Sequence, residues 1–204
     1  MIWEVKSSSI KSVVNDYLKE GIAHTLDETR NLSDSGQFED ISLQQGIRQI
    51  LYPYEEMEVL NPEWEVILKD IIDSLFEQMS DEEYNILNEE FGTYMVSRAY
   101  EYRQLLEYFV FRYFAKSIYD YDFLGKCQML VTNFFVIRQM DIIRWLDNHR
   151  EYSFKDRMDV VHIFSRQVEY SEDNIENLYE DFIFDDIFKT DSLIAILWID
   201  SENI

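Results

Sequence analysis

Residues 123–147, FLGKCQMLVTNFFVIRQMDIIRWLD, decide the fold class of this chain. The segment contains no proline, and its apolar residues recur with the period of a helix. Over residues 129–137, MLVTNFFVI, the pattern is apolar almost all round, which is typical of a helix enclosed by other helices. We therefore predict a helix over 123–147, capped by Asp122, as the central and most buried element of a bundle.

Helix signals continue on both sides of this segment. An apolar stripe with helical spacing runs over residues 64–79, and a second run over residues 81–119 is broken near Gly92. Residues that favour helix starts precede the periodic segments: Asn61 before Pro62, Ser80, Ser153, Ser171 and Asp191. The pattern predicts an all-α, single-domain bundle of six to eight helices.

The pattern is weaker before residue 61. It predicts a helix over residues 10–18 that ends at Gly21, a polar loop over residues 31–40, and a short helix over residues 41–52 stopped by Pro53. We therefore divide the chain into a less regular N-terminal subregion, residues 1–60, and a helical bundle domain, residues 61–204.

Charge is the strongest compositional signal in the chain. It has 18 basic and 41 acidic residues among 204, a net charge of −23. Nucleic acid is excluded as a partner, because binding its backbone requires basic side chains that displace counterions. The net charge is −14 over residues 1–100, +1 over 101–168 and −10 over 169–204. The acidic flanks are either solvated helix faces or a docking surface for a basic protein.

Several kinds of site are absent from the sequence. There is no glycine-rich phosphate loop and no serine nucleophile elbow. Cys127 is the only cysteine, which excludes an intrachain disulfide or a cysteine-only metal cage. Asp159 and His162 share a helix face, but a di-iron bundle site needs a second such motif, and none exists. We therefore expect no metal. With no signal peptide and no membrane-length apolar run, we expect a cytoplasmic protein.

Two polar groupings interrupt the apolar helices. Arg138, Asp141 and Arg144 stand three residues apart on the central helix. They form either a local ladder, with Asp141 bridging both arginines, or a polar site inside the bundle. The second grouping is the run from Tyr100 to Arg103, followed by Glu107, Arg112 and Tyr113. Its mixture of aromatic and basic side chains fits either a surface that stacks on a nucleobase or core packing.

Three stretches carry a resemblance to a known family. Residues 105–146 contain an aromatic Tyr-Phe run and the junction YDYD at 119–122, and residues 153–182 and 47–68 add further similarity. A Ser-x-x-Val-Glu-x-Ser-Glu-x-Asn segment is formed by Ser165, Val168, Glu169, Ser171, Glu172 and Asn174. These stretches resemble the C-terminal helical region of flagellin lysine-N-methylases.

The resemblance implies methyl transfer from S-adenosylmethionine to lysine side chains of flagellin. Family members also carry an N-terminal cysteine cluster, whereas this sequence has only Cys127. It therefore looks like the helical half, inactive alone, with a separate cysteine-cluster domain as a partner. Tyrosines and carboxylates would suit a lysine amine, and the candidates are Tyr100, Tyr102, Glu169 and Glu172. The candidates for binding the cofactor are Arg103, Arg138, Asp141 and Arg144.

Two further functions remain open at the level of sequence. One is a non-catalytic acidic module or inhibitor that docks on a basic protein surface, steered by long-range charge. The other is an acidic mimic of nucleic acid that blocks a basic groove, which requires acidic residues spaced along one surface.

Overall fold

A computed structural model describes residues 41–202 of the chain. Within this range every regular element is a helix, which confirms the predicted all-α class. The helix predicted over 10–18 and the loop over 31–40 lie outside the described residues, and the division of the chain at residue 60 stays a prediction. The α-helices are α2 (Leu43–Glu55), α3 (Pro62–Ile71), α4 (Asp81–Met95), α5 (Ala99–Tyr113), α6 (Ser117–Asp120), α7 (Phe123–Asp147), α8 (Phe154–Phe164), α9 (Glu172–Phe184) and α10 (Thr190–Glu202).

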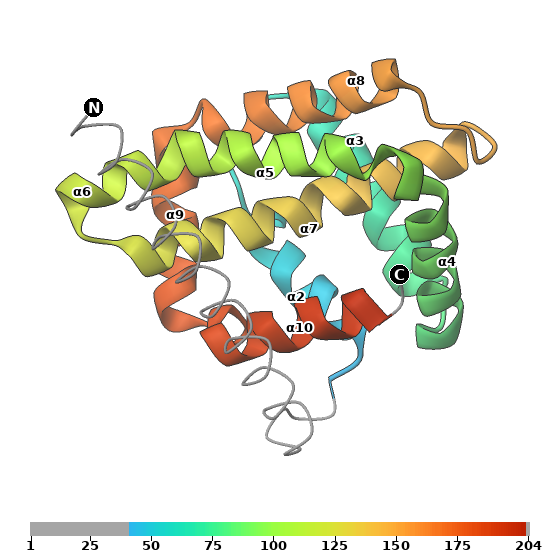
Figure 1. The fold of residues 1–204 in the computed structure, drawn as a ribbon, viewed down its shortest axis with the longest axis horizontal. Helices are drawn as coiled ribbons and strands as arrows, with labels where there is room; N and C mark the ends of the chain where they lie inside the picture. Colours follow the sequence, from blue (N-terminus) through green and yellow to red (C-terminus); the bar gives the residue numbers. More distant parts are fainter. Residues whose placement is uncertain (1–40, 203–204) are drawn as a thin grey trace, which may run out of the picture. The chain divides into compact units, whose positions relative to one another are not determined.

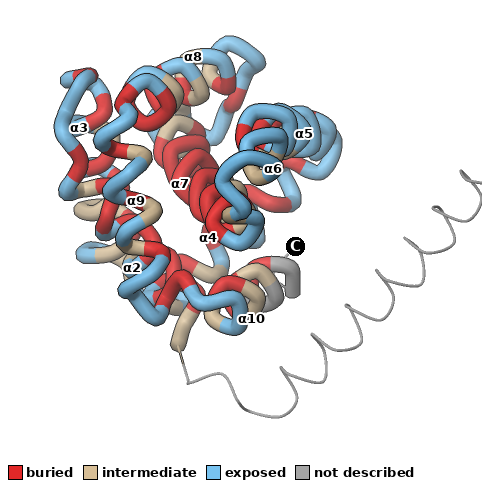
Figure 2. Tube along the Cα trace, turned by 90° about the vertical axis from the view of Figure 1, so that its left-hand side faces the viewer, coloured by how far each residue is buried: buried red, intermediate tan, exposed pale blue. Residues whose placement is uncertain are grey.

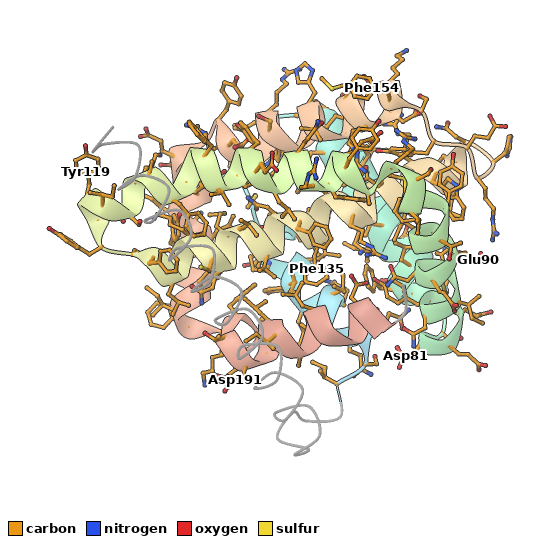
Figure 3. All side chains as sticks on the ribbon, viewed as in Figure 1. Asp81, Glu90, Tyr119, Phe135, Phe154 and Asp191 are labelled. Atoms are coloured by element: carbon orange, nitrogen blue, oxygen red, sulfur yellow. The ribbon has the colours of Figure 1, made fainter. Side chains whose placement is uncertain are left out.

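Helix α7 is the centre of the bundle, as the sequence predicts. Figure 1 shows it crossing the middle of the molecule, with α5 and α8 on one side and α10 on the other. Seen along its length in Figure 2, it is a buried column enclosed by the other helices. Phe135 is 1% exposed and lies in the interior (Figure 3). The surrounding helices contribute further buried aromatic side chains: Tyr54, Trp64, Tyr84, Phe91, Phe109 and Phe164.

Side-chain caps fix where the helices begin. In each case a side-chain oxygen accepts a hydrogen bond from a backbone N–H of the first turn, which would otherwise have no partner. Ser80 and Ser153 form full capping boxes, with Glu83 and Asp156 respectively. The predicted caps that the structure confirms are Asn61, Ser80, Asp122, Ser153 and Ser171.

Two predicted helix ends are wrong. Helix α2 passes through Pro53 and ends at Glu55. The proline removes one backbone hydrogen bond, and the full burial of Tyr54 beside it offsets that loss. Helix α4 continues through Gly92, since Phe91 and Met95 bury apolar side chains on either side. The chain instead turns at two 3₁₀ segments, η2 (Val96–Arg98) and η3 (Phe114–Lys116).

Two helices end in wider π-helical turns, η1 (Ile72–Glu77) after α3 and η4 (Ser165–Glu169) after α8. Such turns are rare and often occur at functional sites. The side-chain oxygen of Gln167, in η4, accepts hydrogen bonds from the backbone N–H groups of Leu60 and Asn61, at 2.9 and 3.2 Å. The start of α3 is thereby fixed against η4.

A helix that crosses a membrane must be both long and apolar. None of the helices described within residues 41–202 combines these two properties.

Candidate functional site

A buried ionic network surrounds Asp141 near the end of α7. Its carboxylate is fully buried and accepts hydrogen bonds from the hydroxyls of Tyr102, at 2.7 Å, and Tyr152, and from the guanidinium of Arg157. Arg157, from α8, also lies 3.3 Å from Glu101 of α5. Burial raises the pKa of Asp141, while Arg157 and the two phenols oppose that shift. Hydrogen bonds and ion pairs of this network therefore connect α5, α7 and α8.

Arg138 belongs to a second buried pair. Its Nη1 donates to Asp200 of α10 at 2.9 Å, and its Nη2 donates to Asn88 of α4 at 2.9 Å. The predicted ladder in which Asp141 bridges Arg138 and Arg144 is therefore wrong. A helix that is covered on all sides finds its ionic partners on the helices around it: Asp141 pairs with Arg157 of α8, and Arg138 pairs with Asp200 of α10. The alternative interpretation, polar groups inside the bundle, agrees with the structure.

Beside these networks is a small pocket of about 210 Å³. Two of the predicted site residues, Tyr102 and Arg138, contribute to its wall, and most of the rest of the wall is apolar. Its lining residues are Phe91, Gly92, Met95, Val96, Ala99, Tyr102, Phe134 and Arg138.

The π-helical turn η4 places Glu169 beneath two tyrosines of α5. The carboxylate accepts hydrogen bonds from the Tyr113 hydroxyl at 3.1 Å and the Tyr108 hydroxyl at 3.1 and 3.2 Å. The guanidinium of Arg112 lies 3.7 Å away. The Glu169 side chain is only 4% exposed, whereas Tyr108 is 45% exposed. Tyr108 therefore stands between the carboxylate and the solvent.

The two phenols in this cluster stay protonated at neutral pH. Burial raises the pKa of Tyr113 and of Tyr108, and the charge of Glu169 raises both further. The cluster thus holds two hydrogen-bond donors and one carboxylate acceptor. Such a set can bind an amine and accept a proton from it.

Arg144, the remaining cofactor candidate on α7, lines a polar surface pocket of about 260 Å³. The pocket lies where the start of α3 meets α7, α8 and η4. The same pocket contains Asp159 and His162, the pair that the sequence places on one helix face. Its lining residues are Asn61, Glu63, Arg144, Asp159, His162, Ile163 and Arg166.

The other sequence candidates face the solvent. Tyr100 is 49% exposed, and Glu172 is exposed at the start of α9. Arg103 is exposed as well, with Glu107 as an ion-pair partner at 3.6 Å on the surface of α5. These three residues do not join the clusters described above. Within residues 41–202 no three His, Cys, Asp or Glu side chains group as metal ligands would.

Comparison with known proteins assigns the family. The family model of the FliB lysine N-methylase C-terminal domain matches residues 2–196. The chain belongs to this family. No curated protein and no solved structure matches it. The match agrees with the resemblance seen in the sequence, which pointed to the C-terminal helical region of flagellin lysine-N-methylases.

Glu169, a site candidate that the sequence predicts within residues 165–174, lies at the centre of this cluster, but the sequence does not predict its partners. The sequence places Tyr113 in a grouping that fits either nucleobase stacking or core packing, and Tyr108 is not among its candidates. The spacing of Tyr108 and Arg112 could have indicated these partners, because residues four apart share one face of a helix. Arg157, the partner of Asp141, carried no comparable signal, since its pairing depends on how α8 packs on α7.

Proposed function

We propose that this FliB-family chain serves methyl transfer from S-adenosylmethionine to lysine side chains of flagellin, in the bacterial cytoplasm. The observation that carries the proposal is the family match over residues 2–196. The Glu169 cluster supports it, because a carboxylate between phenols suits a lysine side chain. We further propose that a separate cysteine-cluster domain is a partner in the reaction.

The chemistry begins with the charge of the lysine. The ε-ammonium has no lone pair and must lose a proton before its nitrogen can attack a methyl group. In the proposed site Glu169 binds the ammonium by a charge-assisted hydrogen bond and accepts that proton, becoming a neutral carboxylic acid. Tyr108 and Tyr113 donate hydrogen bonds that orient the carboxylate. Tyr108, half exposed, moves aside to admit the lysine.

When bound, S-adenosylmethionine supplies the methyl group on a sulfonium. The residues of this chain fit such a ligand, because the pocket around Arg144 contains a buried amide donor, Asn61 Nδ2, that has no hydrogen-bond partner in the described part of the chain. Arg144 and Asn61 would hold the polar end of the ligand there.

Glu169→Gln should lower methylation of flagellin at least about 100-fold, the range expected when a general base is lost. Methylation would be measured by mass spectrometry of flagellin produced together with the chain and a cysteine-cluster protein. Glutamine keeps a hydrogen-bond acceptor for the tyrosines, so the melting temperature should change little. Glu107→Gln, which removes an exposed carboxylate from α5, is the matched control and should keep full methylation. Equal activity of the Glu169→Gln variant and the wild-type protein would remove Glu169 from the mechanism.

One specific observation favours the second candidate function, an acidic module or inhibitor that docks on a basic surface. Burial raises the pKa of Asp181, and the neighbouring charges of Asp185, Glu56 and Glu180 raise it further. Carboxylates from the ends of α2 and α9 are therefore close enough to repel one another. A basic partner would relieve this repulsion, and its binding should weaken as falling pH protonates Asp181.

Docking through the carboxylates of α9 can be tested by changing the salt concentration and by substitution. Association with a basic partner such as flagellin should slow steeply as salt rises from about 50 to 500 mM, where the Debye length falls below about 10 Å. Neutralising five carboxylates of α9 should weaken binding and leave helix content unchanged. The substitutions are Glu172→Gln, Asp173→Asn, Glu176→Gln, Glu180→Gln and Asp181→Asn. Binding that responds to neither change would reduce this face to solvated surface.

A further inference from the structure

The pocket around Arg144 has a composition that the proposed proton transfer does not use. Arg144 of α7 and Arg166 of η4 supply two positive charges, while Glu63 of α3 and Asp159 of α8 supply two negative charges. The charges are therefore balanced, with both signs in one small space. A balanced site of this kind disfavours a simple anion or cation and favours a ligand that carries both charges.

None of these four charged side chains forms an ion pair with another in the described part of the chain. The ion pairs and side-chain hydrogen bonds found among residues 41–202 include none made by the side chains of Arg144, Arg166, Glu63 or Asp159. Elsewhere in the bundle the inward-facing arginines are paired, as Arg138 is with Asp200. The pocket thus offers donors and acceptors that no other described side chain occupies, and these groups can bind a ligand.

Asn61 gives a second, independent indication of a ligand. It is 4% exposed and lines the pocket. Its side-chain oxygen accepts a hydrogen bond from the backbone N–H of Glu63, which fixes the orientation of the amide. Among residues 41–202 the buried Nδ2 group has no hydrogen-bond partner, and such a group is costly unless something accepts its hydrogen bond. It also lies at the start of α3, where the helix dipole favours a negative group.

We propose that this pocket binds an α-amino-acid group, the carboxylate and ammonium carried on one carbon atom. The carboxylate is held by Arg144, Arg166 and the Nδ2 of Asn61. The ammonium is held by Asp159 and Glu63. The identity of the ligand as S-adenosylmethionine rests on the proposed function, whereas recognition of its amino-acid end rests on the pocket itself.

The size of the pocket fits one end of such a ligand. Its volume is about 260 Å³, below the range of about 300 to 1,000 Å³ that encloses drug-sized molecules. Ile163 is its apolar lining residue and is buried. The pocket therefore takes the amino-acid end and leaves the adenosine outside it.

Four probes separate the amino-acid end from the rest of the ligand. Calorimetric titration of the full chain would compare S-adenosylmethionine, S-adenosylhomocysteine, free methionine and 5′-methylthioadenosine, which lacks the amino-acid end. We expect 5′-methylthioadenosine to bind at least about tenfold more weakly than S-adenosylhomocysteine, because it forms no charge-assisted bonds in the pocket.

Variants test whether the binding occurs in this pocket. Arg144→Gln and Arg166→Gln should each weaken S-adenosylhomocysteine about tenfold or more and leave 5′-methylthioadenosine unchanged. Lys116→Gln, which removes an exposed positive charge in η3, should bind as the wild type does. Circular dichroism would show whether each variant folds. Arg166 is exposed, so Arg166→Gln should fold and keeps the test valid if Arg144→Gln does not.

Each outcome bears on one proposal or the other. Three results would overturn the pocket assignment. They are equal affinity for S-adenosylhomocysteine and 5′-methylthioadenosine, wild-type affinity of both arginine variants, and no binding of any probe. Binding of methionine alone, lost in both variants, would support the amino-acid pocket and count against S-adenosylmethionine as its ligand. Arginine-dependent binding without any methylation of flagellin would support the pocket and contradict the proposed function.

Discussion

Replacing Asp141 with asparagine should lower the free energy of unfolding by about 3 to 5 kcal/mol, the cost of breaking a buried ion pair from one side. The carboxylate is 0% exposed and is bonded to Tyr102, Tyr152 and Arg157. Its removal leaves the guanidinium of Arg157 buried, with Glu101 as its remaining ionic partner among residues 41–202. Urea denaturation followed by circular dichroism would measure the change.

An exposed ion pair provides the comparison for this variant. Glu107→Gln removes the partner of Arg103, and both side chains of that pair are about 70% exposed. Its effect should stay below about 1 kcal/mol, because water screens surface charges. If Asp141→Asn is as mild as Glu107→Gln, the network does not hold α5, α7 and α8 together.

Phe135→Ala should cost about 3 to 5 kcal/mol of unfolding free energy, as large-to-small changes in a core do. Phe135 is 1% exposed at the centre of α7, and the substitution leaves a cavity that the surrounding helices fill only in part. Since domains of this size are stable by about 5 to 15 kcal/mol, soluble yield should also fall. Thermal and urea unfolding would measure the loss.

Alanine substitutions at two other phenylalanines provide the comparison for Phe135→Ala. Phe134 is only partly buried, so Phe134→Ala should cost less than Phe135→Ala. Phe111 is 89% exposed, and its replacement by alanine should change stability by no more than about 0.5 kcal/mol. A near-neutral Phe135→Ala would mean that α7 is not the core of the bundle.

The sequence predicts the central helix and both of its ends, and the physical reason is local. Phe123–Asp147 begins after an Asp122 cap, and its apolar residues over 129–137 cover almost every face. Caps and periodicity depend on neighbours within one turn, so they are visible without tertiary structure. The errors at Pro53 and Gly92 arose where packing outweighed local propensity, because Tyr54 and Phe91 are buried beside them.

The candidate site was less predictable because its parts come from distant segments. Glu169 was identified, but Tyr108 and Tyr113 reach it from α5, 61 and 56 residues earlier in the chain. Asp141 pairs with Arg157 through the packing of α8 on α7, and no spacing rule on α7 reveals it. The wide turn η4, which orients Glu169, is a local departure from helical geometry that periodicity does not encode.

The most direct test of the proposed function is the intact mass of flagellin produced in a bacterium that lacks its own lysine methylase. Flagellin would be compared with and without this chain, each with a cysteine-cluster protein supplied. The account predicts added methyl groups on lysine with the wild-type chain and their loss with Glu169→Gln. Flagellin of unchanged mass in the presence of the folded wild-type chain would contradict it.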